Sequence, residues 1–379
     1  MDREVFLALW LHYGTGHNGK LFQRVQEYYP DLEEAYVAAQ KRQGSAFAKF
    51  TPELCARLFE AADPKFMERY IGWLARHKIG ILALDSPEYP ELLAEIEDAP
   101  PLLFVRGKLP PSPALPIGVI GARACSDHGK LIAKHFGFQL AESGATVITG
   151  LAEGIDSYAT VGALDCASSE CPAIGVLGCG IDIIYPPNGK AVFETLAERG
   201  AIVTEFLPKT PPIAYHFPLR NRIVSGLSRG ILVVEAGERS GCSITANLAL
   251  EQGRDVFAVP GRITDPQSIG TNRMIVNGEA KPVACAADIL CEYDSAFLAV
   301  QADTRKSVPF STLEPRAQAV YHALYTGEKN IDILQEMTGI SVSELNSVLT
   351  AMQFAGIIRQ SAGRTYALDT LQATVLLDT

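Results

Sequence analysis

Short runs of β-branched and aliphatic residues alternate with longer segments of helical length between residues 117 and 290. Each run is continuous rather than interrupted by polar positions, as in strands that are covered on both faces. The pattern therefore predicts repeated strand–helix–strand units and a doubly wound, mainly parallel α/β sheet. The predicted strands are Ile117–Ile120, Thr146–Thr149, Ile174–Leu177, Ile202–Thr204, Ile231–Val234 and Val256–Val259.

Residues 1–80 show a different pattern, because apolar positions recur there at helical spacing. We predict a small all-helical N-terminal domain. Gly14, Gly16 and Gly19 separate its first two helices. They form either a plain tight turn or a helix-hairpin-helix whose amides contact a phosphate, and the plain turn is favoured because glycine serves any tight turn. The predicted helical segments are Val5–Leu11, Leu21–Tyr28, Leu54–Ala61 and Phe66–Leu74.

Residues 81–116 lead into the α/β domain, which we predict to span residues 81–290. The apolar segment Leu102–Phe104 follows Pro100 and Pro101. This pattern is typical of a strand that joins the edge of a sheet. Further prolines between residues 110 and 116 stiffen the approach to the first parallel strand.

Residues 291–309 are mixed and polar, which predicts a linker, and residues 310–379 form a small C-terminal module. Residues 356–368 of this module predict two short strands around a Ser-Ala-Gly turn. Together with three helices before it, this hairpin predicts a winged-helix domain. The predicted helices are Pro315–Tyr325, Ile331–Met337 and Ser341–Phe354.

The charge of this C-terminal module disfavours binding to duplex DNA. Its candidate recognition helix, residues 341–352, has no Lys or Arg, and residues 310–379 carry four Lys or Arg against seven Asp or Glu. Proteins that read a DNA groove depend on phosphate contacts and need positive charge. We therefore expect the module to contact protein rather than duplex DNA.

The whole chain of 379 residues is acidic, with a formal net charge of −10, and 47% of it is apolar. That apolar fraction excludes general disorder, and the longest apolar runs are about half of the ~18 residues that a membrane span needs. The first residues lack the basic-then-apolar pattern of a signal peptide. The eight cysteines contain no C-x-x-C pair. We therefore expect free thiols, no metal site, no membrane span and a cytoplasmic location.

The segments that follow the predicted strands carry glycine, hydroxyl and charged residues. Ligands of open α/β sheets bind at these carboxyl ends of the strands. After the first strand, Gly121 permits close approach of the backbone to an anion, and Arg123 supplies a planar cation suited to phosphate. Ser126 or Asp127 can cap the next helix and leave its other amides facing a ligand.

A local excess of positive charge follows the fourth strand. Residues 205–230 contain four Lys or Arg against one Glu, a net of +3, with Tyr215 and Phe217 among them. Single-stranded nucleic acid needs cations for its phosphates and rings for its bases, and stacking contributes about 1–3 kcal/mol per base. A structural role for these residues is an equally open alternative. In that case they form a helix whose arginines cap carbonyls and pair with Glu205 or Glu235.

Several common ligand sites are excluded by missing motifs. The first strand is not followed by G-x-G-x-x-G, because Arg123 stands where a glycine is required, and this disfavours NAD or FAD. The chain also lacks the P-loop motif G-x-x-x-x-G-K-[ST]. We therefore expect no cofactor and no catalytic residue.

Several motifs follow one another in a fixed order along the α/β region. They are Ile120–Arg123 with Gly129, Thr149–Asp156, Gly178–Asp182 with Tyr185-Pro186, Phe217–Ile223, Ser240-Gly241 with Thr245-Ala246, Gly253–Gly261 and Gly270–Asn272. In these motifs the sequence resembles the DNA-processing protein A family, also called DprA or Smf. The resemblance covers about residues 80–290. It implies a Rossmann-like α/β domain between a sterile-alpha-motif-like N-terminal domain and a winged C-terminal domain.

The resemblance implies a non-catalytic protein that binds single-stranded DNA, protects incoming strands during natural transformation and helps to load the RecA recombinase. It also implies a homodimer formed through the Rossmann-like domain, with residues 270–283 as the candidate face. The DNA-binding residues that the family's motifs imply are Gly121, Arg123, Lys190, Phe217, Arg220, Asn221, Arg222, Ser240, Gly241 and Thr245.

Two positions depart from the family's pattern. Cys242 stands where serine is usual, and Gly189 stands where asparagine is usual after Tyr-Pro, with Asn188 one position early. These departures affect the details of the expected pocket rather than the resemblance as a whole.

Two other functions are compatible with parts of the sequence. A Rossmann-like phosphoribohydrolase acting on nucleoside monophosphates would use paired acids such as Glu153/Asp156 or Glu235/Glu238. Its P-G-G-x-G-T-x-x-E signature is missing, because Arg262 stands at the second glycine. A purely structural adaptor is the other alternative, and arginines at strand ends disfavour it because an adaptor needs no phosphate site there.

Overall fold

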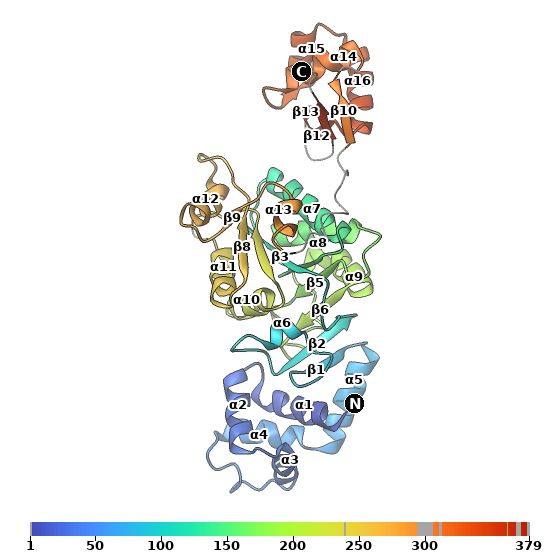
Figure 1. Cartoon of the computed structure of the whole chain (residues 1–379). Coiled ribbons are helices and arrows are strands. Elements are labelled where there is room, and N and C mark those ends of the chain that lie inside the picture. The colour runs from blue at the N-terminus through green and yellow to red at the C-terminus, as the bar shows by residue number, and fades with distance from the viewer. Residues whose placement is uncertain are drawn as a thin grey trace. The chain divides into compact units, whose positions relative to one another are not determined.

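The computed structural model describes residues 2–238, 240–293, 306–310, 313–361, 363–368 and 373–376. The chain separates into two compact units, Met1–Val300 and Gln301–Thr379. The first unit contains the N-terminal helices and the α/β sheet (Figure 1).

The sheet of the first unit has nine strands, and seven of them, from β6 to β9 across the sheet, run parallel. The strands β1 and β2 add an antiparallel edge beside β6. In sheet order the strands are β1 (Gly80–Ala83), β2 (Leu102–Gly107), β6 (Ala201–Thr204), β5 (Ala173–Val176), β4 (Thr146–Thr149), β3 (Pro116–Ile120), β7 (Gly230–Val233), β8 (Asp255–Ala258) and β9 (Lys281–Pro282).

The predicted strands are confirmed, with their ends within one residue of the prediction. The segment around Leu102–Phe104 joins the sheet as the predicted strand, but it lies second from the edge, between β1 and β6. The sequence patterns missed β1 and β9, which are short and lie at the two outer edges.

Helices cover both faces of the sheet, which explains why every position of the central strands is buried. Val119 and Val147 face one core, whereas their neighbours Ile120 and Ile148 face the other. Around the first core pack α7 (Asp127–Glu142), α8 (Ile155–Asp165) and α9 (Lys190–Arg199), and around the second pack α6 (Glu91–Ala94), α10 (His216–Gly226) and α11 (Cys242–Glu251) (Figure 1).

The strands β3 and β7 are neighbours whose following helices lie on opposite faces of the sheet. The chain therefore diverges between them at their carboxyl ends, and this divergence opens a crevice at the topological switch point. Beyond β8 follow the short helices η2 (Pro266–Ser268), α12 (Ile269–Val276) and α13 (Ala286–Leu290); η1 (Pro187–Gly189) precedes α9.

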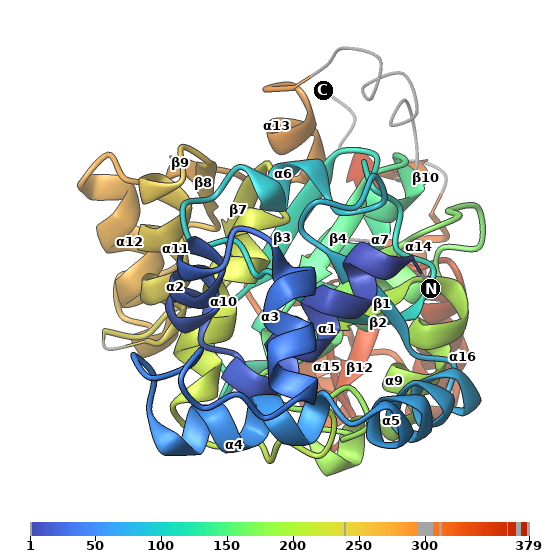
Figure 2. The same ribbon diagram turned by 90° about the horizontal axis from the view of Figure 1, so that it is seen from below.

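The N-terminal helices pack against the antiparallel edge of the sheet, where α1 contacts β1 and β2 (Figure 2). Each helix begins after an Asp, Asn or Thr whose side chain accepts a hydrogen bond from the first turn, which is the preferred N-cap chemistry. These helices are α1 (Arg3–Thr15), α2 (Gly19–Tyr28), α3 (Leu32–Gln40), α4 (Pro52–Ala61) and α5 (Pro64–Arg76).

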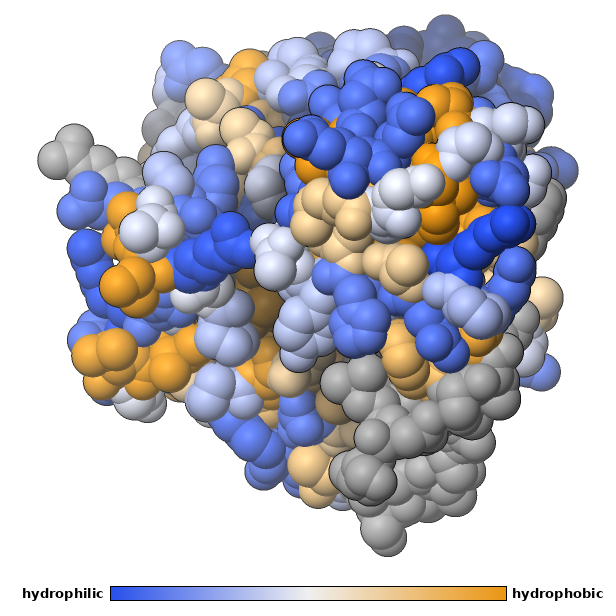
Figure 3. Space-filling model, turned by 90° about the horizontal axis from the view of Figure 1, so that it is seen from above, coloured by the Kyte–Doolittle hydropathy of each residue, from blue (hydrophilic) through white to orange (hydrophobic). Residues whose placement is uncertain are grey.

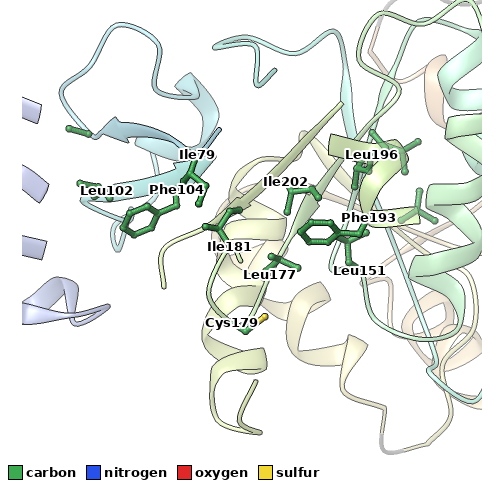
Figure 4. Close-up of a cluster of buried hydrophobic side chains, with 14 of the residues drawn as sticks. Ile79, Leu102, Phe104, Leu151, Leu177, Cys179, Ile181, Phe193, Leu196 and Ile202 are labelled. Carbon is green, nitrogen blue, oxygen red and sulfur yellow. The ribbon is translucent and has the colours of Figure 1, made fainter. Parts of the chain in front are cut away.

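One hydrophobic core continues from the N-terminal helices into the sheet. Figure 4 shows Phe104 and Ile79 on the antiparallel edge, with Ile181 between them and the parallel strand that carries Ile202. The predicted boundary at residue 80 falls inside this unit, so the N-terminal domain as a separate body stays a prediction.

The second unit contains three helices and a small antiparallel sheet of β11 (Lys329–Asn330), β13 (Thr365–Leu368) and β12 (Ile358–Ser361). Val320, Leu334 and Leu349 form its core. These are the elements that the sequence pattern predicts, and the winged-helix assignment itself stays a prediction. The helices are α14 (Pro315–Leu324), α15 (Ile331–Thr338) and α16 (Val342–Phe354), and a parallel pair of strands, β10 (Lys306–Pro309) and β14 (Ala373–Leu376), accompanies them. Most of the predicted linker at 291–309 lies outside the described residues.

Within the described part of the chain, none of the helices combines the length and apolarity needed to cross a membrane. On the face seen in Figure 3, apolar side chains form separate patches among hydrophilic ones. The cysteines are free thiols, and the described residues contain no cluster of His, Cys, Asp and Glu that could hold a metal ion.

The junction between the N-terminal helices and the sheet contains a buried histidine. The imidazole Nε2 of His12 lies 2.8 Å from the carbonyl oxygen of Glu205. Burial lowers the pKa of His12 to about 4, from an ordinary value of 6.5. The folded state therefore holds His12 neutral, and an unfolded chain takes up a proton between these two values.

This histidine predicts a loss of stability in mild acid. The contribution of His12 to the free energy of unfolding is fully present above pH about 6.5. It declines as the pH falls toward about 4, because only the unfolded state gains a proton in this range. Relative to a His12→Gln variant, the wild-type protein should lose about 2 kcal/mol of unfolding free energy between pH about 7 and about 5. Chemical denaturation of both proteins at the two pH values measures this difference, and an unchanged difference would contradict the assignment.

Candidate nucleic-acid interface

A crevice of about 760 Å³ lies at the carboxyl ends of the parallel strands. Its walls come from the segments after β3 to β7, from α10 and the first turn of α11, and from η2. The structure brings eight of the ten residues implied by the resemblance into this crevice: Gly121, Arg123, Phe217, Arg220, Asn221, Ser240, Gly241 and Thr245.

A cation and two rings stand together at the crevice. The guanidinium carbon of Arg123 lies 5.1 Å from the centre of the Phe217 ring. The ring of Tyr185 lies 5.2 Å from Phe217, tilted by 41°. Arg123 is exposed and both rings are half-buried. The arrangement offers a permanent positive charge beside ring surface, which suits a phosphate next to a base.

The start of α11 forms another wall of the crevice. Its N-cap is Gly241, and no side chain caps the helix there. An added Cβ at Gly241 would meet no atom within 4 Å, so open space surrounds this position. The amides of Ser243 and Ile244 donate to the carbonyls of Ser240 and Gly241 at 3.2 Å, so this wall offers an anion the positive end of the helix dipole rather than a row of free amides.

Cys242 directly follows this glycine and is buried. Its thiol lies 2.9 Å from the Ser240 hydroxyl, and burial raises the pKa of the thiol. The residue that departs from the family's usual serine therefore contributes a small neutral group to the wall.

A buried arginine and a buried carboxylate form the floor of the crevice. The Arg220 guanidinium donates to the carbonyl oxygens of Gly150 and Val176, at the ends of β4 and β5. The Asp156 carboxylate accepts a 2.9 Å hydrogen bond from the amide of Gly150. Burial lowers the pKa of Arg220 to about 10 and raises that of Asp156 to about 6. Any Cβ at position 150 would lie 2.5 Å from the guanidinium, which accounts for the glycine there.

The start of α7 is closed by a carboxylate of the protein itself. Glu235, after β7, accepts hydrogen bonds from both the amide and the hydroxyl of Ser126, and the same hydroxyl accepts from the amide of Gly129. We expected the amides of α7 to face a ligand. The structure corrects this expectation, because Glu235 binds the cap residue and α7 does not line the crevice.

Arg222 and Lys190 are the two implied residues that the structure does not bring into the crevice. Arg222 follows Arg220 by two positions, which turns it by about 200° around the helix axis. It binds the Glu205 carboxylate at 2.7 and 2.9 Å and Asp98 at 2.9 Å. Lys190 is exposed at the start of α9, 3.8 Å from Glu194.

Several residues that line the crevice were absent from the predicted set, Tyr185 and Gln267 among them. Tyr185 follows β5 and stands in the Tyr-Pro motif, which was a usable signal for a ring at this place. Gln267 enters from η2 and donates a 2.6 Å hydrogen bond to the carbonyl of Ala124. No motif in the sequence marks it.

A doubly wound sheet with a cationic and aromatic crevice at its switch point defines a class of α/β proteins that bind phosphate-containing ligands. A family model described as DNA recombination-mediator protein A matches residues 80–294, which is more than half of the chain. The chain belongs to this family.

Curated relatives carry the names of the same family. Protein Smf of Escherichia coli (strain K12) is 42% identical over 224 residues, which cover 59% of this chain and 59% of that protein. DNA processing protein DprA of Streptococcus pneumoniae is 39% identical over 60% of this chain and 82% of the relative. Protein Smf of Synechocystis is 29% identical over 95% of this chain and 98% of its own length.

Two solved structures are similar to this chain. The X-ray structure of DprA from Streptococcus pneumoniae matches with a TM-score of 0.61 and 32% identity, over 78% of this chain and 99% of that one. A Helicobacter pylori DprA structure, described as giving insights into its single-stranded DNA binding mode, matches with a TM-score of 0.51 and 27% identity, over 57% and 98%.

The geometry of Arg222 predicts a structural role. Its side chain is 12% exposed and that of Glu205 is 1% exposed. Arg222→Ala should lower the unfolding free energy by about 3–5 kcal/mol, because the Glu205 carboxylate would stay buried without its arginine. Arg123→Ala removes an exposed side chain and should change stability by less than about 0.5 kcal/mol. Denaturant titration compares the two variants, and equal losses would contradict this division of roles.

Proposed function

We propose that this protein binds single-stranded DNA in the switch-point crevice and acts as a recombination mediator. The observation that carries the proposal is the Arg123 guanidinium over Phe217, with Tyr185 beside it, next to the uncapped start of α11. Cations paired with stacking rings are the common means of binding single strands without sequence preference. The family description and the single-stranded DNA binding of the Helicobacter pylori relative support it.

Each residue of the crevice has a distinct task in this proposal. Arg123 pairs with a phosphate, and Phe217 and Tyr185 stack against neighbouring bases. Gly241 lets the strand's phosphate approach the amides of α11. Arg220 is bound to carbonyl oxygens, so it supplies positive potential from below and holds the floor in shape.

The acidic net charge of the chain favours single-stranded over duplex nucleic acid as the ligand. With a net charge of −10, the molecule has no excess of cations to coat a duplex. A confined crevice admits a flexible strand whose bases can turn toward rings, and a duplex hides those base surfaces. Binding is therefore selective for single strands and sensitive to salt.

The cellular role that follows is protection of incoming single strands in natural transformation and delivery of those strands to the RecA recombinase in the cytoplasm. We place the homodimer contact on the face around α12. Ile263 is 91% exposed and Val276 is 84% exposed there, and the short edge strand β9 lies beside them. Exposed aliphatic side chains beside an open strand edge are typical of a protein interface.

Oligonucleotide binding across a range of salt concentrations tests the proposal. Arg123→Ala should weaken binding to oligothymidine by about tenfold, since it removes a charge-assisted phosphate contact. It should also reduce the slope of log K against log salt by about 0.7. Gly241→Ala should weaken binding while leaving stability unchanged, because the fold has space for the methyl group and the bound strand does not.

A matched control is Lys134→Ala, which removes an exposed cation that is paired with Asp165 and lies on α7, a helix that contributes no residue to the crevice. Its binding should equal that of the wild type. Absence of single-strand binding by the wild-type protein at low salt would overturn the proposal. Equal binding by all three variants would overturn the crevice as the site.

The alternative function, a phosphoribohydrolase, requires a free pair of acids. Asp156 and Glu235 are held by backbone and hydroxyl groups, and Glu238 lies 3.4 Å from Arg273. We therefore propose that the protein is not an enzyme of this kind. Incubation with AMP should release no ribose 5-phosphate, and measurable release at a rate proportional to protein concentration would refute this.

A further inference from the structure

A second cavity, of about 660 Å³, lies between the N-terminal helices and the segment that follows β6. We call it the aromatic cleft. It is separate from the crevice and shares none of the crevice's residues. Its lining comprises Tyr13, Arg57, Glu60, Phe66, Arg69, Tyr70, Trp73 and residues 207–211.

The rings of the cleft form one packed group. Phe66 and Tyr70 lie nearly parallel, with centroids 6.2 Å apart. Tyr13 meets them edge-on at 4.9 and 5.6 Å. Trp73 follows on the same helix, with the ammonium of Lys209 6.0 Å from its ring. These side chains are half-buried, so ring surface stays open to the cavity.

One polar atom in this group lacks a partner. The Tyr70 hydroxyl is buried and makes no hydrogen bond within the described part of the chain. A buried hydroxyl without a partner costs free energy, which a ligand with a polar edge would recover.

The charges around the rings are mostly positive. Arg57, Arg69 and Lys209 line the cleft against Glu60 alone, a local net of +2 in a chain of −10. Arg57 donates a 2.8 Å hydrogen bond to the carbonyl of Tyr13, which fixes it beside the rings. Cations around open rings match the chemistry of phosphates beside bases.

The cleft and the crevice are neighbours along one segment of the chain. Pro211 lines the cleft and Pro212 lines the crevice. Tyr215, in the same segment, is 67% exposed. The segment therefore forms a short ridge with a cavity on each side, and an exposed ring stands on it.

We propose that the aromatic cleft is a second binding site for the strand held in the crevice. In this arrangement a base enters beside Trp73, its polar edge meets the Tyr70 hydroxyl, and Lys209 and Arg69 contact the flanking phosphates. The proposal rests on the proposed function of the crevice. It assigns the N-terminal helices a direct part in holding DNA.

The two tryptophans of the chain make this proposal measurable. Trp10 is fully buried and donates a 3.0 Å hydrogen bond to the carbonyl of Leu58, whereas Trp73 lines the cleft. A DNA-dependent change in tryptophan fluorescence therefore reports on Trp73. An oligothymidine of roughly 16 nucleotides should quench the fluorescence, and one of roughly 4 nucleotides, which fills only the crevice, should bind without quenching.

Variants separate the cleft from the crevice. Trp73→Phe should remove the quenching while keeping a ring. The double variant Arg69→Ala/Lys209→Ala should weaken binding of the long oligonucleotide by roughly five- to tenfold and leave the short one unchanged. Lys65→Ala is the matched control, because Lys65 is an exposed cation on the same helix outside the cleft. Its binding of both oligonucleotides should equal that of the wild type.

Failure of the cleft and failure of the crevice give different results. If both oligonucleotides bind with equal affinity and neither quenches Trp73, the cleft proposal is overturned and the crevice stands. If neither oligonucleotide binds, both are overturned. Quenching of Trp73 by recombinase without DNA, together with no quenching by the long oligonucleotide, would show that the cleft holds a protein partner instead.

Discussion

The candidate site depends on one buried cation. Arg220 lies inside the fold, and its guanidinium binds carbonyl oxygens at the ends of two adjacent strands, with the Asp156 carboxylate nearby. A buried charge is stable only when it is paired and hydrogen-bonded, so α10 can approach the strand ends in one position. That position sets Phe217, one turn earlier, beside Arg123. Phe217 and Arg123 therefore meet because the buried charge of Arg220 fixes the position of the helix that carries the ring.

The pairing of buried charges also explains how an acidic chain presents a positive site. Glu235 accepts a hydrogen bond from the amide of Ser126 at the start of α7, and Asp156 accepts one from the amide of Gly150 after β4. Glu205 binds the Arg222 guanidinium on α10. These carboxylates are directed inward to backbone amides, a hydroxyl and arginine. Arg123 remains exposed at the crevice. The net charge of the chain therefore does not give the charge of the crevice. The local charge there depends on which charged groups are already paired inside the fold.

The sheet could be predicted from the sequence almost completely, because strands covered on both faces leave an uninterrupted apolar run such as Ile231–Val234. The crevice was also largely predictable, since the carboxyl ends of the strands are fixed by the fold class. Arg222 was misplaced because the family's Arg-Asn-Arg motif was taken as one unit, although two positions along a helix place Arg220 and Arg222 on nearly opposite sides. The aromatic cleft could not be seen in the sequence at all. Tyr13, Trp73 and Lys209 are far apart along the chain and meet only through the packing of the N-terminal helices on the sheet edge.

Glu205 joins three parts of the molecule at one point. Its carbonyl oxygen accepts from His12 of α1, and its carboxylate binds Arg222 of α10, which also binds Asp98 in the lead-in segment. A chimaera that combined this sheet with the N-terminal helices of a relative would have to carry a matching partner for that carbonyl. The N-terminal helices are thus not an interchangeable module. For domain exchange, the unit to transfer is the helices together with the sheet edge that they cover.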